Sequence, residues 1–274
     1  MFRLAVIALF TLAAPAFAAD AVPTATGVFR SQAITLEANG AVAFRAKSFF
    51  DDKSALIVAV SNVNFRPAAI ADYVDRRRLI QQRVMDDQTG VVWLEFRPDG
   101  TYRGMSYYFG QGNGCQFCTG EVVSTVKLVD GKLAGKVTDK EKDRSFDLTL
   151  AVPVLSDDHG AALPADGGAP GKAYMQYHAA LGKGDRAALR PLLSTEQQKF
   201  LDEAQKNGRF DVMLDAMKEG HPNKSVQITG GFMAGDKAVL LITGEGSLVR
   251  LNGEALMLKE GGTWRVDDEI TVGE

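Results

Sequence analysis

Cys115 and Cys118 are the only two cysteines of the chain and stand three positions apart. The same spacing occurs in thiol oxidoreductases, where the pair lies at the start of a helix whose dipole lowers the thiol pKa. In this chain, glycine-rich residues on both sides of the pair indicate a loop between two antiparallel strands. The pattern therefore predicts a local disulfide that closes the loop, with thiol exchange at the pair as a weaker alternative.

Neither haem nor zinc suits this cysteine pair. A c-type haem site would need a histidine at the next position, where Thr119 stands. A zinc site would need two further ligands, and the three histidines, His159, His178 and His221, show no metal-site spacing. The sequence thus predicts no metal and no cofactor.

Apolar and aromatic residues recur between positions 173 and 181 at spacings of one, three and four, as on one side of a helix. These residues are Ala173, Tyr174, Tyr177, His178 and Leu181. Gly182 and Gly184 would end this helix, and Asp185 stands where it can cap the next one. Two helices with a sharp break are therefore expected over residues 171–193.

Residues 19–155 are expected to form a β-rich domain. Short runs in them alternate apolar and polar positions, and turn signals such as Asn39-Gly40 and Asp130-Gly131 separate the runs. Roughly eight strands in a sandwich or barrel would account for this spacing. One helix, from Pro67 to about Met85, would lie on these strands.

Residues 156–171 have no periodic apolar face and are rich in Gly, Pro, Ala and Asp, which marks a linker. Residues 172–274 then form a second domain, in which helical patterns come first and strand patterns follow. The fold class expected for the chain is therefore α+β, with a β-rich sandwich or barrel linked to an α+β domain.

The second domain also resembles a known family. Its residues Tyr177 to Leu181 precede a Gly184-Asp185 pair, and a Gly261-Gly262 turn precedes Thr263-Trp264-Arg265-Val266. With the order of helices and strands, these stretches are similar to small secreted bacterial members of the nuclear-transport-factor-2-like (cystatin-like) superfamily. The resemblance covers residues 171–272. It implies a cone-shaped domain, in which a curved antiparallel sheet wraps around the first helix and leaves a pocket.

The resemblance also implies where a ligand would bind and what the protein would do. The pocket residues that it implies are Tyr174, Tyr177, His178, Leu181 and Trp264. Many members of the superfamily bind a small apolar molecule, or a partner protein, without catalysis. Non-catalytic binding of a small apolar ligand or of an envelope protein is the expected function, with homodimerisation through the C-terminal sheet as a further expectation.

An acid/base enzyme, such as an isomerase, dehydratase or hydrolase, is the alternative. Members similar to ketosteroid isomerase pair a base with a hydroxyl donor, because proton abstraction beside a carbonyl needs both groups. His178 would be the base and Tyr174, one helical turn before it, the donor. A histidine on an apolar face is more often a hydrogen-bonded core residue, so a non-enzymatic role is favoured.

The first 18 residues have the features of a secretory signal peptide, with a positive start, a short apolar core and small residues before the expected cut after Ala18. We therefore expect a periplasmic or secreted protein. The apolar core, Leu4 to Ala14, is too short to span a bilayer, so no stable membrane anchor is expected. The formal net charge of −3 and the lack of a recognised motif give no reason to expect nucleic-acid binding.

Overall fold

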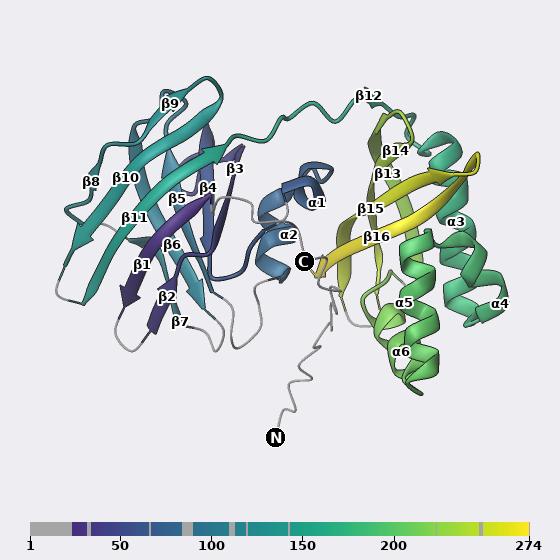
Figure 1. Cartoon of the computed structure of the whole chain (residues 1–274). Coiled ribbons are helices and arrows are strands. Elements are labelled where there is room, and N and C mark those ends of the chain that lie inside the picture. The colour runs from purple at the N-terminus through teal and green to yellow at the C-terminus, as the bar shows by residue number, and fades with distance from the viewer. Residues whose placement is uncertain are drawn as a thin grey trace. The chain divides into compact units, whose positions relative to one another are not determined.

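The computed structural model describes residues 24–273 except 32–33, 66, 84–89, 110–112, 119, 142, 223 and 247–248. The expected signal peptide, residues 1–18, lies outside the described residues. The described residues divide into two compact units (Figure 1). The first unit consists of residues 24–71 and 75–157, and the second of residues 72–74 and 158–273.

The first unit contains two antiparallel sheets that share one hydrophobic core. One sheet has the strand order β2-β1-β11-β10-β8, with β9 also paired to β10, and the other has the order β3-β4-β5-β6-β7. The strands of the first sheet are β1 (Ala25–Ser31), β2 (Ile34–Glu37), β8 (Val123–Ser124), β9 (Lys127–Val129), β10 (Lys132–Lys140) and β11 (Arg144–Pro153). Those of the second are β3 (Gly40–Lys47), β4 (Ser54–Ser61), β5 (Gly90–Phe96), β6 (Tyr102–Phe109) and β7 (Asn113–Cys118).

Alternation of side chains builds the core of this sandwich. On β11, Phe146, Leu148 and Leu150 are buried, whereas Asp147 and Thr149 between them are exposed. The central strands β4 and β5 are instead buried along nearly their whole length. Continuous apolar runs in the sequence therefore correspond to strands that are covered on both faces.

The second unit places its helices before most of its strands. The elements are β12 (Ala161–Ala162), α3 (Gly168–Lys183), α4 (Arg186–Leu189), a 3₁₀ helix (Arg190–Leu192), α5 (Thr195–Lys206), α6 (Phe210–Glu219), β13 (Ser225–Ala234), β14 (Lys237–Glu245), β15 (Arg250–Glu260) and β16 (Thr263–Gly273). The five strands form one antiparallel sheet in sequence order. The helices α3 to α6 lie against this sheet (Figure 1), and both contribute to one hydrophobic core.

The predicted break between the first two helices of this unit is confirmed. Gly184 ends α3 with a φ of 68°, in the left-handed region that favours glycine. The carboxylate of Asp185 then accepts a hydrogen bond from the amide of Ala188, at 3.1 Å, and so caps α4.

The α+β class expected from the sequence is wrong for this chain. Strands make up 50% of the described residues and helices 25%, in three antiparallel sheets and six helices, so the chain is mostly β. One reason is that the strands of the second unit are long. The sequence pattern predicts separate strands at 247–251 and 254–259, but β15 runs through Asn252 and Gly253, because both remain paired with β14 and β16.

The single helix expected in the first unit is also wrong. Two helices, α1 (Pro67–Ala71) and α2 (Arg76–Arg83), take its place. Asp75 accepts a hydrogen bond from the amide of Arg78 at 3.1 Å, so a new helix begins after it.

The expected linker, residues 156–171, contains β12 and the first residues of α3. Ala161 and Ala162 pair with β13 through the backbone, and this pairing needs no apolar pattern in the side chains. Among the helices that the structure describes, none combines the length and the apolar composition that a membrane span requires.

Candidate functional site

Three titratable side chains from distant parts of the second unit form one hydrogen-bonded chain. The Nδ1 atom of His178 lies 2.5 Å from Nε2 of His221. The Nδ1 atom of His221 lies 2.7 Å from Oε1 of Glu269, and the hydroxyl of Tyr174 donates to Oε2 of Glu269 at 3.2 Å. We refer to His178, His221 and Glu269 together as the His–His–Glu chain.

The helix α3 supplies two members of this arrangement. Tyr174 and His178 are four residues apart and therefore lie on the same side of the helix, one turn from each other. Tyr174 is fully buried and reaches Glu269, whereas His178 is only partly buried. His178 is thus one end of the His–His–Glu chain and is partly open to solvent, and Glu269, bonded to Tyr174, is the other end.

A β-bulge directs Glu269 toward the helices. Trp264 and Val266 of β16 belong to the core that faces the helices, so strict alternation would place Asp268 on that face and Glu269 on the other. The register of β15 and β16 shifts at this point: Met257 pairs with Val266, but Leu256 pairs with Asp268. The extra residue, Asp267, reverses the alternation. Glu269 therefore stands opposite Ala255, a residue of the same helix-facing core.

His221 occupies the connection between α6 and β13, where the backbone is fixed to β16. The hydroxyl of Thr271 on β16 donates to the carbonyl of Gly220, the residue before His221. Thr271 and Glu269 are two positions apart and so point to the same face of the strand. This contact keeps His221 beside Glu269.

Aromatic rings enclose His221, which is 2% exposed. The ring of Tyr177 is nearly perpendicular to it, with the centroids 5.7 Å apart, and the centroid of Tyr174 lies at 6.1 Å. Buried polar groups are costly unless they are hydrogen-bonded. Both ring nitrogens of His221 meet this requirement, one through His178 and the other through Glu269.

The hydrogen-bond partners define where the protons lie. An ionised Glu269 can only accept, so His221 donates from Nδ1 and accepts at Nε2. The bond at Nε2 is then donated by Nδ1 of His178. The lone pair of His178 is consequently on Nε2, the ring nitrogen that does not bond to His221.

Burial shifts the ionisation of His178, Tyr174 and Tyr177 at this site. The pKa of His178 is lowered from its ordinary value by burial, and further by the charge that His221 can carry. The pKa of the Tyr174 hydroxyl is raised well above its ordinary range, first by burial and then by the Glu269 carboxylate. Near neutral pH, His178 therefore favours the neutral form with a free lone pair, and Tyr174 remains a hydrogen-bond donor.

The residues that the family resemblance places around a pocket are mostly part of the core. Tyr174, Tyr177, Leu181 and Trp264 are between 0% and 9% exposed and pack in one hydrophobic cluster with residues of β14 and β15. His178 is the exception because it is partly exposed. Tyr174 contacts the Glu269 carboxylate directly and His178 is linked to it only through His221, and the Tyr174 hydroxyl is not directed toward solvent.

Neither His221 nor Glu269 is singled out by the sequence pattern. His221 follows Gly220 and precedes Pro222, which reads as the end of a helix. Glu269 falls on the outer face under regular alternation. One signal could have drawn attention to His221. It directly follows a helix, α6, and this helix must pack on α3.

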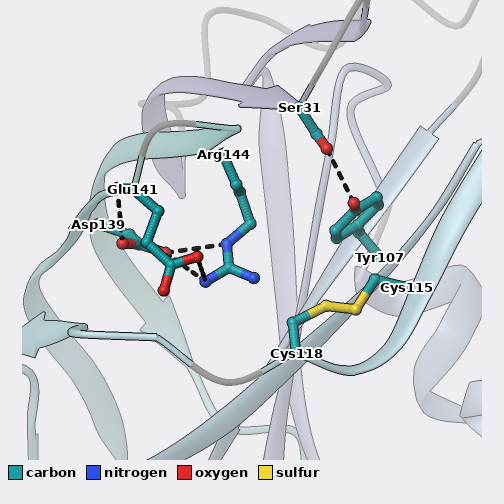
Figure 2. The surroundings of a disulfide bond; sticks show 7 residues. All are labelled: Ser31, Tyr107, Cys115, Cys118, Asp139, Glu141 and Arg144. Carbon is teal, nitrogen blue, oxygen red and sulfur yellow. Dashed lines mark hydrogen bonds and ion pairs between the residues drawn. A yellow bond between two sulfur atoms is a disulfide. The ribbon is translucent and has the colours of Figure 1, made fainter.

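The cysteine pair lies in the first unit, and the predicted disulfide is confirmed. Cys115 and Cys118 are bonded to each other, with their Cα atoms 5.9 Å apart (Figure 2). Both lie on the strand β7 and not in a loop, because β7 pairs with β6 through this stretch. Tyr107, opposite Cys115, shares a hydrogen bond of 2.8 Å with Ser31 (Figure 2).

A buried ion pair is drawn beside this disulfide in Figure 2. Arg144 donates to one carboxylate oxygen of Asp139 from two nitrogens, at 2.9 and 2.6 Å, and also lies 3.0 Å from Glu141. Asp139 and Arg144 are both less than a tenth exposed, so each needs the other as partner. Within the part of the chain that the structure describes, no group of three His, Cys, Asp or Glu residues is arranged to hold a metal ion.

A comparison of the chain with models of known protein families finds no match, and neither does a comparison with curated proteins. The resemblance to the nuclear-transport-factor-2-like superfamily therefore stays a prediction.

Proposed function

We propose that the second unit contains a proton-transfer site. In this site His178 acts as general base and general acid on a carbonyl or ester substrate. The observation that supports this proposal is the His–His–Glu chain. It leaves the lone pair of His178 on the outer nitrogen and puts a mostly buried carboxylate behind the two rings.

The His–His–Glu chain would assist catalysis by spreading the charge that forms. When Nε2 of His178 takes a proton, its Nδ1 proton can move toward Nε2 of His221. The positive charge is then shared with a ring that faces Glu269, which stabilises the protonated state. The proton leaves by the reverse path when His178 returns it to the product. General acid–base catalysis of this kind typically contributes about 10²- to 10⁴-fold.

Tyr174 has a different role here from the one that the sequence suggests. Its hydroxyl is fully buried and bonded to Glu269, so it fixes the carboxylate and does not contact the substrate. Tyr174 is thus a positioning residue.

Non-catalytic binding of a small apolar ligand or an envelope protein stays a prediction. The close packing of Tyr174, Tyr177, Leu181 and Trp264 offers it no support inside the second unit. Homodimerisation through the sheet, export and thiol exchange also stay predictions.

Two assays with the His178→Gln variant test the proposal. One follows hydrolysis of p-nitrophenyl acetate and butyrate, and the other follows deuterium exchange beside the carbonyl of small ketones by NMR. We expect the wild-type protein to accelerate at least one reaction and His178→Gln to lose about 100-fold or more of that rate. The matched control is His159→Gln, because His159 packs on Phe232, away from the His–His–Glu chain. Equal rates for wild type and His178→Gln in both assays would contradict the proposal.

A further inference from the structure

A surface depression of about 550 Å³ in the second unit is lined by three arginines. The lining residues are Arg186, Ala187, Arg190, Pro191, Gln198 and Arg265. They come from α4, the 3₁₀ helix, α5 and β16. None of them belongs to the His–His–Glu chain.

The fold brings the three arginines together in a defined way. Arg186 and Arg190 are four residues apart and lie on the same side of consecutive helical turns. The segment that follows is fixed to β16, because the amide of Ser194 donates to the carbonyl of Val266 at 2.8 Å. Val266 is the neighbour of Arg265, so this contact sets Arg265 beside the helical turns.

The carboxylates near the depression neutralise these arginines only in part. Arg190 is paired with Asp202 through two hydrogen bonds, at 3.2 and 2.8 Å. Arg186 stacks its guanidinium over the ring of Phe210, 4.4 Å from the centroid, and its charge acts on Asp202, the carboxylate that is already hydrogen-bonded to Arg190. Arg186 and Arg190 thus share one carboxylate, which leaves a net positive charge at the depression.

Arg265 is partly paired. One of its terminal nitrogens lies 3.3 Å from Glu260, and its buried Nε has no hydrogen-bond partner among the described residues. The same carboxylate of Glu260 accepts shorter bonds from the amide and the hydroxyl of Thr195, at 3.0 and 2.8 Å. Glu260 is thus shared, and the second terminal nitrogen of Arg265, which has no hydrogen-bond partner among the described residues, is able to bind another anion.

From this arrangement we infer that the depression binds an organic oxyanion, a carboxylate or a phosphate ester that carries a small apolar group. Guanidinium groups bind both oxyanions through paired hydrogen bonds, so the two share one recognition chemistry. Ala187 and Pro191 provide apolar surface for the rest of the ligand. The volume lies within the range of small-molecule sites.

Titration of the full chain with three probes, followed by amide NMR, tests this inference. The probes are phenyl phosphate, phenylacetate and inorganic phosphate. We expect at least one of the two organic anions to shift the amide signals of Ala187 and Gln198, and to bind more weakly as the salt concentration rises. Inorganic phosphate should bind more weakly than phenyl phosphate, because it lacks the apolar group. Tighter binding of phenyl phosphate would identify the ligand class as a phosphate ester, and tighter binding of phenylacetate would identify it as a carboxylate.

Variants of the lining arginines complete the test. Arg186→Gln and Arg265→Gln should each weaken binding by about tenfold or more, because each removes a charge-assisted contact. The matched control, Arg209→Gln, changes an exposed arginine of the same unit that does not line the depression, and it should bind like the wild type. The inference is overturned if neither organic anion shifts the two amides, or if both variants bind as tightly as the control. Either outcome leaves the proposal for His178 unaffected, since that proposal depends on other residues.

Discussion

His221 donates to Glu269 across 2.7 Å, and this bond joins the end of α6 to β16. It exists because the extra residue Asp267 turns Glu269 toward the helices and because Thr271 holds the carbonyl of Gly220. The pair is almost closed to solvent, since His221 is 2% exposed and the Glu269 side chain 11%. Its contribution can be measured through stability, pH dependence and activity.

Replacing Glu269 with alanine should destabilise the protein by about 3 kcal/mol, because the buried His221 ring and the Tyr174 hydroxyl both lose their partner. Urea denaturation followed by tryptophan fluorescence measures this change. Glu203→Ala, on the exposed side of α5, is the control and should stay within about 0.5 kcal/mol of the wild type. A loss below about 1 kcal/mol for Glu269→Ala would mean that the bond is not formed in solution.

The pH dependence of stability should contain a contribution from His178. Its pKa in the folded protein is lowered from the ordinary value of 6.5, so the unfolded chain binds the proton more tightly. The contribution is fully present above pH 6.5 and is lost as the pH falls from there through the lowered pKa. The free energy of unfolding should therefore decrease on acidification in this window, and less so in His178→Gln.

An NMR titration of the His178 ring protons checks the same shift directly. A midpoint at or above pH 6.5 would show that His178 is not desolvated by its neighbours. His159, which lies outside the His–His–Glu chain, serves as the internal comparison in the same spectra.

The Tyr174→Phe variant tests whether the Tyr174 hydroxyl only positions Glu269 or takes part in catalysis. The ring still fills the core, and only the hydroxyl bond to Glu269 is removed, so the stability should fall by about 1 kcal/mol. In whichever assay the wild type is active, kcat/KM should decrease by less than about tenfold, compared with about 100-fold for His178→Gln. A loss as large as that of His178→Gln would instead indicate that the hydroxyl contacts the substrate.

Removal of the disulfide should lower the stability moderately. The bond closes a ring of only four residues, so the double variant Cys115→Ser, Cys118→Ser should lose about 2 kcal/mol on the chain-entropy model. Denaturation of the variant and of the oxidised wild type gives the difference. Activity and anion binding should be unchanged, because the disulfide lies in the other unit. Loss of activity without unfolding would instead support thiol exchange.

Local patterns in the sequence were sufficient for features made by neighbouring residues. The end of α3 at Gly184, the cap by Asp185 and the bond between Cys115 and Cys118 each depend on a few consecutive positions. The alternation that sets the buried face of β11 is likewise visible in consecutive residues. These features need no knowledge of the remaining chain.

The site could not be predicted in full, because it depends on contacts between residues that are far apart in the chain. A single extra residue in β16 determines which of Asp268 and Glu269 faces the helices, and bulges have no reliable sequence signal. His221 reaches His178 only after α6 has packed on α3. The arginine-lined depression was missed for the same reason, although the spacing of Arg186 and Arg190 is visible in the sequence.

The disulfide also has a consequence for self-association. Among the described strands, β7 pairs only with β6, so it is an edge of its sheet, and an exposed edge can recruit a strand from another molecule. Between the two cysteines, β7 has one residue more than β6 has between Met105 and Tyr107, so the strand is bent there. The covalent bond holds this bend in place, so β7 does not present a flat edge with which a strand of another molecule could pair. Under reducing conditions the edge can straighten, and concentrated protein would then be more prone to aggregate.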